Sequence, residues 1–194
     1  MAAVWMDPGH GFPDVGALTG DHDAEADSNL AMGLILKPLL LAAGHSVMLS
    51  READVGLSLY ERVDMAWRWG ADLFISLHAD AASRPGPCGP HAIHSIHDTK
   101  WDRGKRLAFL LTQALPEVTG RAAWRQPWCR RSLVTPWLDY YGILRYAHAK
   151  RIHAAVILER GFVTNPEDAR LLFDDEYLKL QAKGIVLAVK RYGL

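Results

Sequence analysis

The stretch DLFISLHA, residues 72–79, decides the fold class of this chain. It is an almost unbroken apolar run, which is typical of a strand buried on both faces in the middle of a parallel sheet. On either side of it, strand-like segments alternate with amphipathic segments of helical length. This alternation predicts an α/β fold, with a twisted, mostly parallel or mixed sheet flanked by helices.

The remaining elements can be placed coarsely along the chain. Further strands are expected at 2–6, 45–50, 91–97, 142–147 and 154–162. Helices are expected at 25–43, 57–69 and 102–115, with one or two more within 166–192. Proline should kink the first helix near Pro38 and close the third at Pro116, because it lacks the N–H that a helix uses. No repeat is visible, so we expect a single domain over residues 1–194.

Composition excludes several classes of protein. The 194 residues are 49% hydrophobic and 23% charged, and 22 basic residues balance 22 acidic ones, so no global charge draws the chain to nucleic acid. The longest apolar run is broken by Lys37 and Pro38 and is shorter than the roughly 20 residues of a membrane span. We therefore expect no nucleic-acid partner and no membrane insertion.

Two cysteines and the amino-terminal segment bear on cellular context. Cys88 and Cys129 cannot form a disulfide framework, so free thiols are expected, with a single bridge between them as the alternative. The first residues read as a strand that meets Asp7 and Pro8, without the pattern of a signal peptide. We expect a protein made in the cytoplasm without a cleaved leader.

Three short segments carry a potential metal ligand at a strand end or a helix start. They are His10 in DPGHG, Glu25 in EADSNL and His78 in FISLHAD. Strand ends of this kind converge on one crevice in open α/β sheets. Two imidazoles and a carboxylate are the three protein ligands of catalytic zinc sites, and Glu159, at the end of the apolar run VILE, would be the base.

Each of these residues also has a plain structural alternative. His10 follows Pro-Gly and could be a turn residue, while Glu25 could serve the dipole or cap of its helix. His78 could be a hydrogen-bonded core imidazole. Glu159 is harder to dismiss, because glutamate is rarely buried without a partner. The joint occurrence of the four at matching positions is what favours a metal site.

The motifs also resemble a known family in order and spacing. The series is DPGHG, EADSNL, SREAD, ERVDMA, ADLFISLHADA, GILRYA and ILERGFVTNPED. It is similar to that of the zinc-dependent N-acetylmuramoyl-L-alanine amidases of the type-3 family, which includes bacterial division amidases and phage endolysins. The resemblance covers nearly the whole chain and implies the family's phosphorylase/hydrolase-like α/β fold, one zinc ion per chain and peptidoglycan as substrate.

Carried over residue by residue, the resemblance implies specific roles. The zinc ligands fall on His10, Glu25 and His78, and the catalytic glutamate falls on Glu159. The bond cleaved would be the amide between the lactyl group of N-acetylmuramic acid and L-alanine. Glu159 would take a proton from water and deliver it to the leaving amine, a contribution of about 10²–10⁴ in rate.

The chain departs from the family at three positions near these motifs. Phe12 replaces a common glycine, Asp80 replaces an asparagine and Arg160 replaces a threonine. Arg160 could lie beside Glu159 and favour its ionised form, or it could point to the opposite face of its strand. The candidate substrate-binding residues are Arg160, Trp124, Trp128 and Arg145.

Residues 117–140 have no regular period and are rich in tryptophan and arginine. Their side chains could form a wall of the substrate groove, with Trp124 and Trp128 stacking on sugars, or could build a small core under a long loop. His91, His94 and His97 cannot share one ion on a strand, so we expect histidines at the cleft rim or surface. His22 competes with Glu25 for a ligand position, and the resemblance favours Glu25.

These observations favour a single catalytic amidase domain without a separate wall-binding domain. We expect a monomeric phage or prophage endolysin that causes cytolysis and reaches the wall in the periplasm after release, through a holin. A host division or remodelling amidase lacking its leader is the first alternative. Another zinc peptidase or deacetylase and a non-enzymatic wall-binding domain are the others.

Overall fold

The computed structural model describes residues 1–98, 103–122 and 126–194, and is built on one five-stranded sheet with the order β2-β1-β3-β5-β4. The strands are β1 (Ala3–Pro8), β2 (Ser46–Leu49), β3 (Leu73–Asp80), β4 (His91–His94) and β5 (Ala154–Phe162). All pair in parallel except β4, which is antiparallel to β5 at one edge. The strand predicted from DLFISLHA is β3, at the centre, and the predicted mixed α/β sheet is confirmed.

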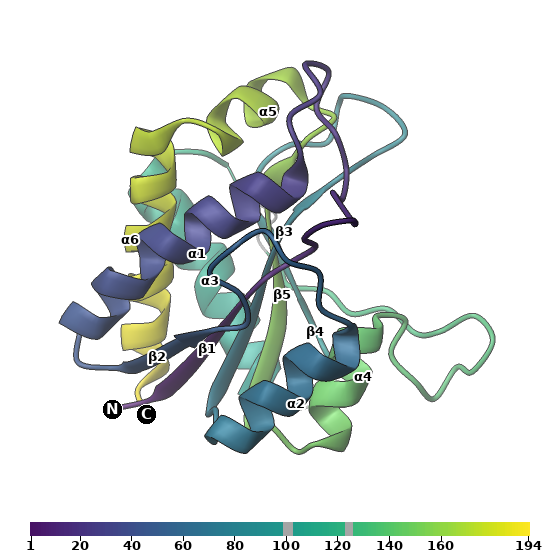
Figure 1. Ribbon diagram of the computed structural model, residues 1–194, viewed down its shortest axis with the longest axis vertical. Helices are drawn as coiled ribbons and strands as arrows, with labels where there is room; N and C mark the ends of the chain where they lie inside the picture. Colours follow the sequence, from purple (N-terminus) through teal and green to yellow (C-terminus); the bar gives the residue numbers. More distant parts are fainter. Residues whose placement is uncertain (99–102, 123–125) are drawn as a thin grey trace.

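Helices cover the two faces of this sheet unequally (Figure 1). One face carries α1 (Glu25–Ala42), α3 (Arg103–Thr119) and α6 (Asp175–Tyr192), packed in a large apolar core. The other face carries only α2 (Leu59–Trp69) and α4 (Gly142–Ala149), packed in a smaller core. The short helix α5 (Pro166–Leu172) follows β5. The cleft that contains His78 and Glu159 lies on this second face.

Strand register determines which side chains line that second face. His78 on β3 pairs with Glu159 on β5, and Glu159 pairs in turn with His91 on β4. Residues opposite each other on neighbouring strands point to the same face. Phe74 and Ile157, nearer the strand beginnings, pack into the smaller core with α2 and α4. Polar side chains nearer the carboxyl ends lie in a cleft at the start of those two helices.

Two expected elements differ from those observed. Residues 142–147 form part of helix α4 rather than a strand, because Ile143, Leu144 and Ala147 are buried at helical spacing. Helix α3 continues through Pro116 to Thr119. Close packing on α6 supports its last turns, since a Cβ at Gly184 would lie 3.2 Å from the Cα of Leu115.

The edge strand β4 is shorter than expected, because it ends at His94 rather than at residue 97. β5 covers Ala154–Phe162, the range expected from the sequence, so Glu159 and Gly161 both lie within the strand. Cys88 and Cys129 are exposed free thiols. In the part of the chain described, no helix has the length and apolar character needed to cross a bilayer.

Candidate metal centre

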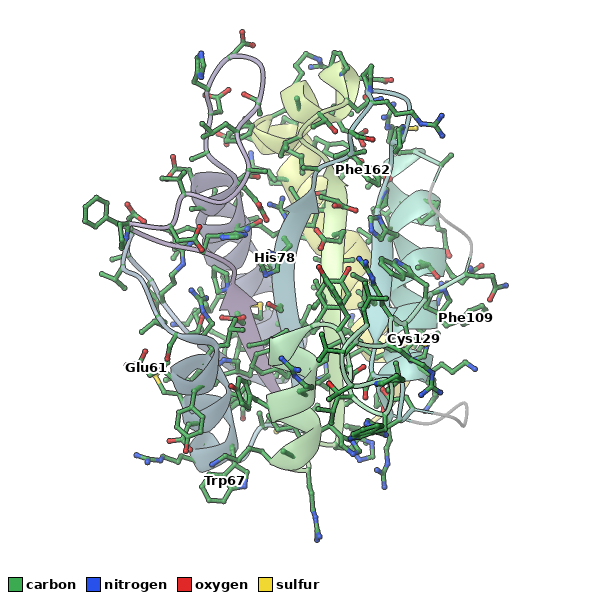
Figure 2. The ribbon with its side chains drawn as sticks, turned by 90° about the vertical axis from the view of Figure 1, so that its right-hand side faces the viewer. Glu61, Trp67, His78, Phe109, Cys129 and Phe162 are labelled. Carbon is green, nitrogen blue, oxygen red and sulfur yellow. The ribbon has the colours of Figure 1, made fainter. Side chains whose placement is uncertain are left out.

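Two histidines and a glutamate that are far apart in sequence meet at the carboxyl end of the sheet. His10, Glu25 and His78 each offer a ligand atom, and these atoms all lie within 4.8 Å of one another. His10 follows β1, Glu25 is the first residue of α1, and His78 lies on β3, where Figure 2 labels it. The set predicted from the sequence is thus brought together, and its atoms could hold a divalent metal ion.

The loop that carries His10 is held by a buried arginine on α2. Arg62 donates to the carbonyl oxygens of Pro8 (2.8 Å) and His10 (2.6 Å). It also forms an ion pair with Asp7 at 2.8 Å, and both side chains are almost fully buried. His10 has a φ of 60°, in the left-handed region that few residues other than glycine adopt. The bonds from Arg62 stabilise this unusual backbone.

A second arginine and two glycines complete the loop. Arg51 donates to the carbonyl oxygens of Pro8 and Gly9, both at 2.9 Å, and is itself buried. A Cβ at Gly9 would lie 2.2 Å from the ring of His78, and one at Gly16 would lie 2.7 Å from Oε2 of Glu25. Only glycine allows the backbone to approach these ligands so closely.

Asp14 orients the ring of His10. Its carboxylate lies 2.8 Å from Nδ1 of His10, while Nε2 of the same ring lies 3.2 Å from the carboxylate of Glu25. Burial alone would lower the pKa of His10, but the hydrogen bonds and charges of Glu25 and Asp14 raise it overall. A carboxylate behind a histidine is the usual outer partner of a metal ligand, because it fixes the ring and its tautomer.

Glu25 is the most enclosed member of the set, with 4% of its surface exposed. Its carboxylate accepts hydrogen bonds from the backbone N–H groups of Ala17 (3.1 Å) and Ala79 (2.9 Å), and lies 3.0 Å from Nδ1 of His78. Burial by itself would raise the pKa of Glu25, but the hydrogen bonds and charges of His10 and His78 lower it strongly. Glu25 is therefore held as an anion that faces both histidines.

Glu159 lies directly across from His78 but outside this cluster. It is 8% exposed, and its Oε2 has no hydrogen-bond partner among the described residues. Burial, followed by the negative charges of Asp80 and Glu25, raises the pKa of Glu159 well above its ordinary value. A buried carboxyl group with a raised pKa in a cleft is typical of a functional acid or base.

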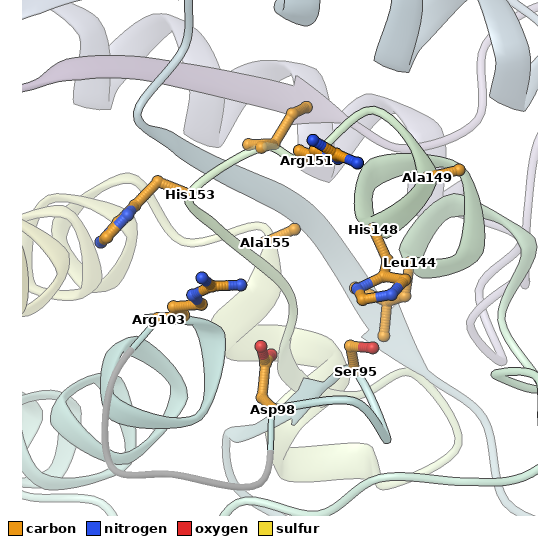
Figure 3. A pocket seen from close by; sticks show the side chains of 10 residues that line it. Ser95, Asp98, Arg103, Leu144, His148, Ala149, Arg151, His153 and Ala155 are labelled. Carbon is orange, nitrogen blue, oxygen red and sulfur yellow. The ribbon is translucent and has the colours of Figure 1, made fainter.

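The cleft around these residues has a volume of about 430 Å³, and Tyr141, Leu59 and Ile143 line it together with His10 and His78. Two larger cavities lie elsewhere. One, of about 580 Å³, lies near the beginning of β5 (Figure 3). The other, of about 620 Å³, lies beside α5. Neither contains a member of the histidine–glutamate cluster, so the smallest of the three holds the candidate chemistry.

Arg160 points away from Glu159, to the face covered by α1 and α6. Its guanidinium donates to Ser28 Oγ (2.9 Å) and Asn29 Oδ1 (2.7 Å), and only 1% of the residue is exposed. Burial lowers the pKa of Arg160 to about 10. A side chain without accessible surface cannot contact a substrate, so its expected role in substrate binding is corrected to that of anchoring α1 to β5.

The other three candidate substrate-binding residues differ in their surroundings. Trp128 pairs with the edge of β4 through its backbone and packs against the smaller core, with its ring 6.1 Å from that of Tyr141. Arg145 is half-buried on α4. Trp124 lies outside the described residues. Trp128 therefore has at least the packing role that the second interpretation of this segment predicted.

The three histidines of residues 91–97 have different surroundings. His91 and His94 are buried, at 1% and 5% exposed, which corrects the expectation of rim or surface histidines for these two. Nε2 of His91 lies 3.2 Å from the carboxylate of Asp80, and His97 stacks on His148 at a centroid distance of 4.2 Å. Among the described residues, no metal-binding group is formed by these histidines.

Several residues that shape the site were not singled out by sequence reasoning. Asp14, Arg51 and Arg62 had no assigned role, although SREAD and ERVDMA were recognised as motifs. The contacts that Arg51 and Arg62 make with Pro8 and Asp7, respectively, join segments about 40 to 55 positions apart, which no local pattern indicates. An arginine in an otherwise apolar helix face, as at position 62, was the one available signal.

The fold and the site together define an α/β protein with a candidate metal centre of the kind that metal-dependent hydrolases use. A family model described as N-acetylmuramoyl-L-alanine amidase, Amidase_3, matches residues 4–191. The chain therefore belongs to the Amidase_3 family.

Individual relatives agree with this assignment. The chain is 32% identical to the N-acetylmuramoyl-L-alanine amidase LytC of Bacillus subtilis over 94% of its length, and 27% identical to AmiC of Neisseria meningitidis over 97%. It spans only 34% and 52% of those two proteins. The structure of the CwlD amidase from Clostridioides difficile, in complex with the GerS lipoprotein, superposes with a TM-score of 0.86 at 26% identity and covers 99% of this chain and 98% of that one.

Proposed function

We propose that this chain is a zinc-dependent peptidoglycan hydrolase that cleaves the amide bond between N-acetylmuramic acid and L-alanine. The observation that carries the proposal is the cluster of His10, Glu25 and His78, with Glu159 beside His78 on the neighbouring strand. Membership of the Amidase_3 family supports the bond and the polymer.

The donor set fits zinc. Two imidazole nitrogens and one carboxylate are the ligands that catalytic zinc sites use, and the carboxylate of Glu25 is anionic already. His10, Glu25 and His78 would hold the ion, with Asp14 supporting His10 from behind. When bound, zinc would activate water and polarise the scissile carbonyl group.

Glu159 would move the protons of the reaction. Its unpartnered oxygen and raised pKa suit a group that takes a proton from the attacking water and returns it to the leaving nitrogen of L-alanine. The apolar surroundings contributed by Ile157 and Ile143 would keep bulk water from competing for that proton.

The polymer would enter from the open end of the cleft. Tyr141 and Leu59 offer apolar surface to the sugar and the lactyl methyl group, and Arg145 on α4 remains a candidate for the carboxylates of the stem peptide. Trp124 and Trp128 remain proposed contacts of the glycan strand, with Trp128 also serving the core.

Two biological settings use this reaction. We keep a phage or prophage endolysin, which would reach the wall through a holin, as the proposed setting, acting as a monomer. A host division or remodelling amidase is the second candidate, and the bacterial source of the relatives LytC and AmiC favours a host enzyme. Sequencing the genes beside this one separates them, because a holin gene is expected only next to an endolysin.

A turbidity assay on chloroform-treated Gram-negative cells, combined with metal analysis, tests the proposed function. We expect about one zinc ion per chain and a steady fall in turbidity that EDTA stops and added zinc restores. Full lytic activity after complete removal of the metal would contradict the proposal. Without lysis by the metal-loaded protein, the assignment of a wall substrate would be wrong.

A further inference from the structure

A braced arm, residues 129–140, projects from the body of the protein. It leaves the edge of β4 after Trp128 and returns to the beginning of α4 at Tyr141. Figure 1 shows it as the green loop that extends furthest from the sheet, beside α4. Neither the candidate metal centre nor the fold requires a projection of this kind.

The tip of the arm is apolar and open to solvent. Leu133 is 82% exposed, Val134 is 89% exposed and Trp137 is 67% exposed. Apart from the terminal Met1, no large apolar residue in the described chain is as exposed as Leu133 and Val134. Neighbouring apolar side chains at one tip mark an interaction surface, whereas scattered single ones do not.

Hydrogen bonds hold the arm in this shape. Ser132 N–H donates to the carbonyl of Leu138 (2.9 Å), and Tyr140 N–H donates to the carbonyl of Arg130 (2.7 Å). At its base, Asp139 is 1% exposed and accepts hydrogen bonds from Ser95 and Ile96, both at 2.7 Å. The fold therefore presents the apolar tip on a structured support.

The charges of the arm are positive. Arg130 and Arg131 are exposed, and neither forms an ion pair within the described chain. Arg131 donates to the carbonyl of Pro136 at 2.9 Å, which keeps its charge close behind the tip. The one acidic residue of the arm is Asp139, which is buried at its base. The exposed arm thus combines aliphatic side chains, an indole and two cations.

We propose that the arm docks on the surface of an anionic phospholipid bilayer. Leu133 and Val134 would enter the acyl boundary, Trp137 would lie at the headgroup level, and Arg130 and Arg131 would meet the phosphates. Aliphatic tips gain little from the hydroxyl-rich surface of a glycan, which argues against a wall polymer as occupant. This is contact with a surface and not a span. It is independent of the amidase function, which could hold without it.

Cosedimentation with vesicles tests the proposal. Vesicles of phosphatidylcholine with phosphatidylglycerol are compared with vesicles of phosphatidylcholine alone, at low and high salt. The test variant is Leu133→Ser/Val134→Ser, and the matched control is Leu41→Ser/Met48→Ser, which removes half-exposed apolar groups on other surfaces. Hydrolysis of a soluble peptidoglycan fragment confirms that each variant is folded.

We expect wild type and control to sediment with the anionic vesicles and the tip variant to bind at least about tenfold more weakly. Arg130→Gln and Arg131→Gln should each weaken binding about fivefold, and high salt should do the same for wild type. Equal sedimentation of tip variant and wild type would overturn the proposal. A second result would also overturn it: wild type does not bind vesicles, and light scattering shows a wild-type dimer that the tip variant does not form. The occupant of the tip would then be a second copy of the chain.

Discussion

His78 on β3 and Glu159 on β5 are register partners on neighbouring parallel strands, and both side chains face the cleft at the beginnings of α2 and α4. The pairing of two adjacent strands therefore sets the distance between a candidate metal ligand and a candidate base, and neither of these two residues lies on a loop. Sites carried on strands hold their geometry better than sites on loops.

Replacement of Glu159 by glutamine should abolish most hydrolysis while leaving the metal site intact. The amide has nearly the shape of the carboxyl group but cannot take a proton, so kcat should fall by about 10²–10⁴. Release of amines from purified peptidoglycan measures the loss, and metal analysis checks occupancy. A variant with wild-type kcat would exclude Glu159 as the base.

The same substitution should change how stability depends on pH. Because burial raises the pKa of Glu159, the folded protein keeps this proton at pH values where the unfolded chain has released it. Below the ordinary glutamate pKa of about 4.3, residue 159 is protonated in both the folded and the unfolded wild type, so its titration adds no difference in stability between wild type and Glu159→Gln. As pH rises toward the higher folded pKa, wild type should lose stability relative to Glu159→Gln.

Thermal melts of the metal-free proteins from about pH 4 to about pH 8 measure this difference in Tm. Asp80→Asn should reduce it, since the charge of Asp80 is the second cause of the raised pKa. A difference in Tm that is constant over this range would mean that Glu159 has an ordinary pKa.

Asp14→Asn should weaken metal binding without unfolding the protein. Asp14 is exposed and lies 2.8 Å from Nδ1 of His10, so its loss frees the ring to rotate and changes its preferred tautomer. Outer partners of metal ligands are worth about 10- to 100-fold in affinity. Competition with a chromophoric chelator gives the zinc Kd. Asp21→Asn, in the same loop without a histidine contact, is the control and should bind zinc as wild type does.

Arg62→Lys should cost both stability and metal affinity. Lysine keeps the charge but cannot donate to Asp7, Pro8 and His10 at the same time. The buried Asp7 carboxylate would then lack a well-placed donor, and the left-handed backbone of His10 would lack its hydrogen bond. We expect a loss of about 2–4 kcal/mol in urea unfolding. The control is Arg68→Lys on the same helix, whose 74%-exposed side chain should matter by less than about 0.5 kcal/mol. Equal effects of the two substitutions would exclude a positioning role for Arg62.

The sequence was sufficient to predict the parallel core of the fold. It was also sufficient to predict that His10, Glu25, His78 and Glu159 lie near the carboxyl end of the sheet. DLFISLHA and AAVILERGF are long apolar runs with one dominant interpretation, and both are strands. Residues 142–147 are too short for periodicity to separate a strand from a helix, and they proved to be helical. Pro116 does not end α3, because packing on α6 outweighs its local effect.

The supporting residues of the site were beyond sequence reasoning for a different reason. Arg62 acts through the carbonyl oxygens of a loop more than fifty positions away, and such contacts exist only once the sheet has formed. The direction of Arg160 was left open because it depends on strand alternation at one residue. Its burial against Ser28 and Asn29 decides between the two alternatives.

Mass spectrometry of a peptidoglycan digest tests the central claim most directly. The zinc-loaded protein should release intact stem peptides that carry a free amine on L-alanine, together with glycan strands that keep their lactyl groups and acetyl groups. Glu159→Gln, loaded with zinc in the same way, should release almost none. Shortened stem peptides, or glycan that has lost acetyl groups while its peptides stay attached, would contradict the account and assign a peptidase or a deacetylase to the same metal centre.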